Sequence, residues 1–270
     1  MVTVLRPLTV GELLDRTFHL YRNNFLLFVG IAAIPQLFVL ALQLVGAGMA
    51  FGGALIGFGV MSVLAGLLSY VAIEISQAAT VMAVSNVHLD QRVTIGSAFS
   101  QAKSSMGRVI GITFLVAIAV GIASLLLIIP GIYVAVMWSM AIPVTVLEGG
   151  GLNASTNRSQ VLTKGNRGRI FVIYVLVALL ALVVTLVLQF ALGIVAGLLA
   201  HGNASLLTSL VQAMAAIGSF LSTSLVGSLA TIALTLIYYD LRVRKEGFDL
   251  QLMMSRLRPN SQAAAASSNP

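Results

Sequence analysis

The chain has 270 residues, of which 59% are hydrophobic and only 9% are charged, and its mean hydropathy is +1.02. Several apolar runs exceed the ~18 residues that indicate a membrane-spanning helix, which excludes a water-soluble globular domain. Cysteine is absent, so disulfides and thiolate metal sites are excluded, and the net charge of +7 comes from basic residues at the ends of apolar runs, which argues against a nucleic-acid-binding domain.

The apolar runs predict helices, because lipid offers no partners for backbone amides and a helix satisfies these groups within itself. Six runs are predicted to span the membrane: residues 25–45, one stretch within 54–86, 109–129, 132–147, 170–200 and 206–239. A tight turn at Pro130-Gly131 is expected between the third and fourth spans. The predicted fold class is an all-α integral membrane protein with six transmembrane helices arranged as three hairpins.

The basic residues predict which way these spans run. All 15 Lys and Arg residues fall in four segments, 6–22, 92–108, 158–169 and 242–258, which precede the first span or follow an even-numbered one. The three opposite connections carry none. Because short cytoplasmic segments hold an excess of Lys and Arg, we expect both termini in the cytoplasm. An odd number of spans would divide the basic residues between the two sides.

An amphipathic segment precedes each predicted hairpin. Thr9 starts the first segment, and Glu12 three residues later completes the pattern of a helix-capping box. The stretch TIGSAFSQAK, which begins at Thr94, repeats the Thr, the aliphatic residue and the Gly of TVGELLDRTF. A third segment, residues 151–169, holds the same place with a weaker apolar face. We expect each to form a cytoplasmic helix in the membrane interface.

This arrangement predicts three repeat units in one orientation, about residues 9–86, 94–148 and 150–246. They form a polytopic membrane domain of residues 1–258, and the low complexity of residues 259–270 predicts a disordered cytoplasmic tail. The alternative, that unrelated amphipathic helices share a few residues, stays open. A repeat in one orientation differs from the inverted repeat of many secondary transporters.

Four stretches together resemble bacterial proteins that carry the glycerophosphoryl diester phosphodiesterase membrane domain: LRPLTVGELLDRTFHLYRNNF, LLIIPGIYVAVMWSMAIPVTVLEG, NRSQVLTKGNRGRIF and YYDLRVRKEGFDLQLM. The resemblance spans nearly the whole chain and implies a bacterial inner-membrane protein of this helical architecture, usually of unassigned function. It does not imply hydrolysis, because in hydrolytic relatives the chemistry belongs to a separate soluble barrel with a His-Arg-Gly strand end and acidic metal ligands. Here His19, His88 and His201 are isolated, and none is followed by Arg-Gly.

Glu74 is the one acidic residue deep inside an apolar run, and Gln77 lies one helical turn further on. A carboxylate at the centre of a bilayer costs ~2.5–3.5 kcal/mol on insertion scales, so both residues are candidates for a proton, cation or polar-substrate site. Two structural alternatives are a hydrogen-bonded carboxyl that holds helices together and a register that places Glu74 near the cytoplasmic interface.

Arg158 falls on the apolar face of the third amphipathic segment, and Glu148 ends the fourth predicted span. An arginine on such a face needs a carboxylate, a carbonyl or a lipid phosphate as its partner. We therefore predict that Arg158 pairs with Glu148 or another carboxylate, in a structural role.

A basic patch is a further candidate for binding anionic lipid headgroups, with each charge contributing about 1 kcal/mol near such a surface. Its members are Lys164, Arg167, Arg169, Arg242, Arg244 and Lys245. The alternative is ordinary anchoring of the cytoplasmic helix ends.

No phosphate-binding glycine loop, Ser-His-Asp set or pair of catalytic carboxylates can be assembled, so we predict no enzyme, metal site or cofactor. The expected function is that of a non-catalytic bacterial inner-membrane scaffold or lipid-interacting module, with membrane lipids and proteins at its cytoplasmic face as partners and no nucleic acid. The alternative is a transporter of a small solute or lipid that uses Glu74. The sequence does not determine the oligomeric state.

Overall fold

A computed structural model describes residues 8–51, 55–88, 91–201 and 203–247. Almost all of these residues are helical, and no strand occurs among them. The helices are α1 (Val10–Asn23), α2 (Phe25–Phe51), α3 (Leu55–His88), α4 (Ile95–Leu126), α5 (Ile128–Met137), α6 (Ala141–Leu147), α7 (Leu152–Thr163), α8 (Arg167–Ala200) and α9 (Ala204–Glu246). The predicted disordered tail, residues 259–270, lies outside the described residues.

Six segments are long and apolar enough to cross a membrane, which supports a multi-pass membrane protein. They are Phe25–Met49, Ile56–His88, Ile95–Leu126, Ile128–Leu147, Arg167–Ala200 and Ala204–Glu246. The all-α class and the six apolar segments agree with the sequence prediction. At ~1.5 Å per residue, α9 is about 65 Å long, so it is roughly twice as long as a ~30 Å hydrocarbon core is thick.

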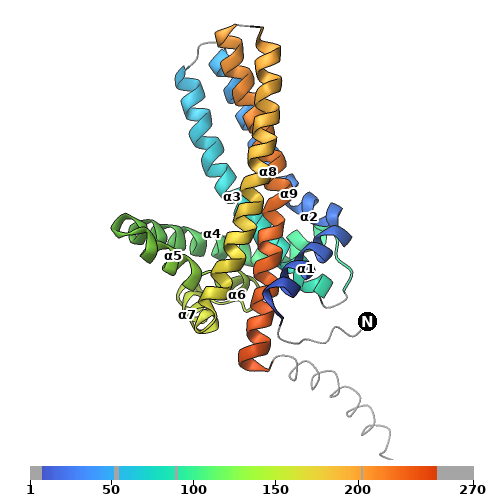
Figure 1. Cartoon of the computed structure of the whole chain (residues 1–270), viewed down its shortest axis with the longest axis vertical. Helices are drawn as coiled ribbons and strands as arrows, with labels where there is room; N and C mark the ends of the chain where they lie inside the picture. The colour runs from blue at the N-terminus through green and yellow to red at the C-terminus, as the bar shows by residue number, and fades with distance from the viewer. Residues whose placement is uncertain (1–7, 52–54, 89–90, 202, 248–270) are drawn as a thin grey trace, which may run out of the picture.

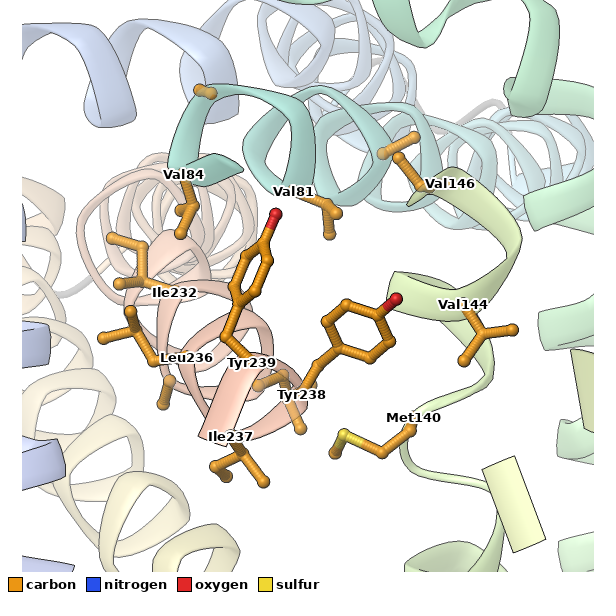
Figure 2. Packing of buried hydrophobic residues seen from close by; sticks show 14 of the residues in the cluster. Val81, Val84, Met140, Val144, Val146, Ile232, Leu236, Ile237, Tyr238 and Tyr239 are labelled. Carbon is orange, nitrogen blue, oxygen red and sulfur yellow. The ribbon is translucent and has the colours of Figure 1, made fainter. Parts of the chain in front are cut away.

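Helix α9 is the centre of the packing. In Figure 1, α2, α3, α8 and α9 run along the long axis, while α1 and α7 lie near the end where α9 finishes. From Ala216 onward α9 is mostly buried, and it contacts α1, α2, α3, α6, α7 and α8. Figure 2 shows Tyr238 directed toward Val144 on α6 and Tyr239 directed toward α3, between Val81 and Val84. These contacts form the main apolar core.

The second amphipathic segment is not a separate interfacial helix. Thr94 caps α4 with a box to Ser97, as Thr9 and Glu12 cap α1, but α4 then continues without interruption to Leu126. Its buried residues Ala98, Ala102, Ser105, Val109 and Ile112 recur at helical spacing. No proline interrupts this stretch, and one continuous face stays in phase with the core, so the predicted boundary near residue 108 is wrong.

The predicted fourth span is also not one straight helix. It consists of α5 and α6, which are separated by a turn at Trp138–Met140. The preceding chain reversal occurs at the extended residue Leu127, and Pro130-Gly131 belongs to α5. Pro130 is in the first turn of α5, where its missing N–H leaves no helical hydrogen bond unmade. The expectation of a turn at Pro130-Gly131 is therefore wrong.

The hairpin of α4 and α5 extends to one side of the long axis (Figure 1). Its tip consists of consecutive apolar side chains that are mostly exposed: Leu125, Leu126, Leu127, Ile128 and Ile129. Such a surface is stable in lipid and unfavourable in water.

We expect Gly131→Ala to destabilise this hairpin. A Cβ at Gly131 would lie 3.0 Å from Ser124 Cβ and 3.1 Å from its Cα, so the backbones of α4 and α5 must separate. Overpacking of this kind costs about 1–3 kcal/mol, which a thermal unfolding midpoint in detergent would register. Gly121→Ala in α4 is the control, because nothing lies within 4 Å of that position. Equal midpoints for the two variants would contradict the close contact.

Candidate functional site

The region where the end of α6 meets α7 and α9 carries an ion-pair network, here called the Glu148–Arg158 network. Arg158 Nε lies 3.0 Å from a Glu148 oxygen, and its second terminal nitrogen lies 2.6 Å from Glu246. Tyr238 donates a hydrogen bond of 2.8 Å to Glu148, and Arg242 pairs with Glu246 at 3.1 Å. The network joins the end of α6 to α7 and α9, which is a structural arrangement.

Electrostatics within this network favour the charged form of Arg158. Partial burial acts to lower the pKa of Arg158, but the carboxylates of Glu148 and Glu246 outweigh it and hold the pKa above its ordinary value. Between 22% and 30% of each side chain remains exposed, so solvent limits what the pairs contribute to stability.

Asp240 forms a second cluster, here called the Asp240 clamp. Its side chain is fully buried, with Arg169 at 2.5 Å, Arg244 at 2.9 Å and the backbone N–H of Leu8 at 2.7 Å. Both arginines also donate to the carbonyl oxygen of Leu8. One carboxylate thus holds the N-terminal segment against α8 and α9, through contacts between residues more than two hundred positions apart.

Two further members of the predicted basic patch, Arg167 and Lys245, are also directed into protein contacts. Arg167 lies over the ring of Tyr133, 4.6 Å from its centroid, and donates to its hydroxyl. Lys245 donates to the carbonyl oxygens of Val161 and Lys164, at 2.6 Å each. Together with the arginines of the two clusters, these contacts engage much of the patch's charge within the fold.

The structure separates Glu74 from Gln77. Glu74 is 6% exposed and lies beside Thr113 of α4. One of its oxygens has no hydrogen-bond partner among the described residues, and no described cation pairs with it. Gln77 instead lines a cavity whose lining does not include Glu74. The two candidates therefore do not form one site.

Two partly enclosed cavities lie between α2 and α3 on one side and α8 on the other, with α9 beneath them; together they are called the lateral groove. The inner cavity has a volume of about 490 Å³ and is lined by residues that include Gln36, Gln77 and Ser228. The outer cavity, of about 460 Å³, is lined by residues that include Gln43 and Gln212. Volumes of ~300–1,000 Å³ are typical of small-molecule sites.

The groove exists because α8 packs mainly against α9 and leaves a space between itself and α2 and α3. Of the described helices, α8 packs chiefly against α9, with smaller contacts to α1 and α5. Between the two cavities, Thr185 of α8 and Ser222 of α9 share a hydrogen bond of 2.5 Å. Further along, Gln189 of α8 lies against Gly218 and donates to the carbonyl oxygen of Ala215. These contacts hold α8 at a defined position over α9.

The lining of the groove is polar but uncharged. Among the residues that the structure describes, no Asp, Glu, Lys, Arg or His lines either cavity. Gln36 Nε2 and Ser228 Oγ have no hydrogen-bond partner within the described part of the chain, although these residues are only 5% and 2% exposed. Gln212 Oε1 is a further buried acceptor that has no hydrogen-bond partner among the described residues. Buried polar atoms of this kind are costly unless they are satisfied, so the groove is suited to a hydrogen-bonding ligand.

Apart from Gln77, sequence reasoning missed the residues of the groove because it weighed charge above other polarity. The available signal was a set of glutamines inside apolar runs, with Gln36 and Gln43 seven positions apart and thus on one face of a helix. Ser, Thr and Gln inside a span commonly serve helix packing. Only the packing of α8 over α9 distinguishes the residues that line a cavity.

The described residues contain no group of three or more His, Cys, Asp or Glu side chains that could hold a metal ion. Comparisons of the chain with protein-family models, with curated proteins and with solved structures find no match. The resemblance to the glycerophosphoryl diester phosphodiesterase membrane domain therefore stays a prediction.

We expect Asp240→Asn to destabilise the protein, because Arg169 and Arg244 then lose their shared carboxylate in a largely buried environment. Breaking a buried ion pair by removal of one partner costs about 3 kcal/mol, measurable as a lower free energy of unfolding in detergent. Asp15→Asn, at an exposed position of α1, is the matched control. If both variants unfold like the unmodified protein, the Asp240 clamp does not stabilise the fold.

Proposed function

We propose that this chain is a non-catalytic multi-pass protein of a bacterial inner membrane that binds membrane lipid in its lateral groove. The lateral groove is the observation that carries the proposal. It is a ligand-sized space between apolar helices, with uncharged hydrogen-bonding groups along its wall. Membrane lipids are the molecules that combine a long apolar surface with a polar head in this environment.

The rim of the groove supports access from the bilayer. Helix α8 presents Val177, Ala178 and Ala181 to the inner cavity. The neighbouring side chains on its other faces, including Leu179 and Val183, are more than half exposed. Exposed apolar residues at the level of the cavity favour hydrocarbon outside the rim, so a ligand would enter sideways from lipid.

We further propose that both termini are cytoplasmic and that the membrane is the bacterial inner membrane. The segregation of all basic residues to one set of connections supports this orientation, and the resemblance described above supports the membrane. In Figure 1, α1 and the last turns of α9 lie at the same end of the long axis, as an even number of crossings requires.

Cysteine labelling tests this orientation directly, because the chain has no native cysteine. We expect Ser205→Cys, at the exposed start of α9, to react with a membrane-impermeant maleimide in intact cells. Ser100→Cys, exposed on the first turns of α4, is expected to react only after lysis. The reverse pattern of labelling would overturn the proposed orientation.

Filling the inner cavity tests lipid binding. We expect purified Ala181→Trp to retain at least severalfold less co-purified lipid per protein than the unmodified chain, because the indole would occupy the space beside α9. Val183→Trp is the matched control, since Val183 is on α8 but 57% exposed. Lipid content is measured by extraction and mass spectrometry after unfolding curves show that both variants are folded. Equal lipid content in both variants would remove the support for a groove site.

Transport that uses Glu74 is the second candidate, because Glu74 is a buried carboxyl with an oxygen that no described residue satisfies. Glu74 does not line the lateral groove, so lipid binding in the groove requires Glu74→Gln to retain normal lipid content. Loss of solute or lipid flux in proteoliposomes on the same substitution would favour transport instead.

A further inference from the structure

Helix α9 supplies polar residues to both cavities of the lateral groove. They are Gln212 and Ser219 in the outer cavity and Ser222, Thr223, Ser228 and Thr231 in the inner cavity. At ~1.5 Å per residue, Gln212 and Thr231 are about 28 Å apart, close to the ~30 Å thickness of a hydrocarbon core. Polar residues of α9 therefore line the two cavities over a length close to that of the hydrocarbon core.

The hydrogen-bonding capacity of the groove lining includes both donors and acceptors. Gln36 Nε2 is a donor, Gln212 Oε1 is an acceptor, and Ser228 Oγ can be either; each is buried without a partner among the described residues. A hydroxyl group both donates and accepts, so it matches such a set. In the inner cavity a hydroxyl can accept from Gln36 Nε2 and donate to Ser228 Oγ, whereas a phosphate can only accept; Gln212 Oε1 lines the outer cavity.

The absence of charge from the lining of both cavities also disfavours a phosphate headgroup. An anion taken out of water needs a cation or several strong donors, and Arg or Lys normally supplies them. Arg169 of α8 and Arg242 of α9 are the arginines nearest in sequence to the lining residues of these helices. Arg169 belongs to the Asp240 clamp and Arg242 to the Glu148–Arg158 network. A phospholipid head would therefore lose its hydration in the groove, and no charged side chain of the lining would compensate for that loss.

From these observations we propose that the lateral groove binds a neutral lipid whose head carries a free hydroxyl, of the diacylglycerol class. This inference rests on the proposed function and specifies its ligand. The hydroxyl bonds with Gln36 and Ser228 in the inner cavity, while an acyl chain lies along the apolar lining residues such as Val177, Val226 and Leu234.

The test uses the full chain reconstituted in vesicles of phosphatidylethanolamine and phosphatidylglycerol. One preparation contains a small fraction of dioleoylglycerol, and a parallel preparation contains the same fraction of dioleoyl phosphatidic acid, which has the same acyl chains and a charged head. After re-extraction in mild detergent, native mass spectrometry measures the lipid bound to each protein molecule. We expect dioleoylglycerol to be enriched over its share of the vesicle lipid and phosphatidic acid not to be.

Two groove variants and a control make the assignment specific. Gln36→Leu removes the amide and is expected to reduce the enrichment of dioleoylglycerol about tenfold, the effect of losing roughly one hydrogen bond in a buried site. Ser228→Ala, a smaller change, is expected to reduce it severalfold and guards against misfolding of the first variant. Gln101→Leu, on an exposed part of α4 outside the groove, is expected to leave it unchanged.

The outcomes separate this inference from the proposed function. Enrichment of phosphatidic acid or phosphatidylglycerol that Ala181→Trp abolishes would overturn the neutral-lipid inference and leave lipid binding in the groove intact. No enrichment of any lipid would overturn both. Enrichment of dioleoylglycerol that Gln36→Leu and Ser228→Ala leave unchanged would place the neutral lipid elsewhere and overturn the inference.

Discussion

The buried carboxylate of Asp240 is the interaction on which the arrangement of the helices depends. Two arginines and the backbone N–H of Leu8 converge on it, although Leu8 is more than two hundred residues from Asp240 in the sequence. Without this acceptor, Arg169 would bring a charge beside the apolar core with no carboxylate to pair with it. Because the same oxygens receive donors from three segments, the last turns of α9 are fixed relative to α8, and the position of α8 follows.

That position of α8 creates the lateral groove. Near the charged end, the Asp240 clamp holds α8 against α9, and further along the Thr185–Ser222 hydrogen bond and the packing of Gln189 on Gly218 continue the contact. On the other side, α2 and α3 pack against each other and against α9. Helices α2, α3 and α8 all pack against α9, and a space remains between α8 and α3. Polar residues of α9 line this space.

Several features follow directly from local sequence patterns. The six apolar segments are predictable because hydrocarbon accepts only helices with long apolar runs. The caps at Thr9 and Thr94 are predictable because a side chain three residues later completes each box. The continuity of α4, the break at Trp138–Met140 and the reversal at Leu127 were not predictable, since each depends on neighbouring helices that a single segment does not specify.

The sequence by itself determined that this chain is a bundle of membrane-spanning helices with its charges gathered in a few connections, because hydropathy and charge act on each segment separately. Only the tertiary structure decided which carboxylate neutralises which arginine, that Glu74 and Gln77 face different surroundings, and that glutamines from α2, α3, α8 and α9 line one groove. The physical reason is that polar residues inside a bilayer look alike in sequence. Whether such a residue packs, pairs or lines a cavity depends on which helix faces it across the bundle.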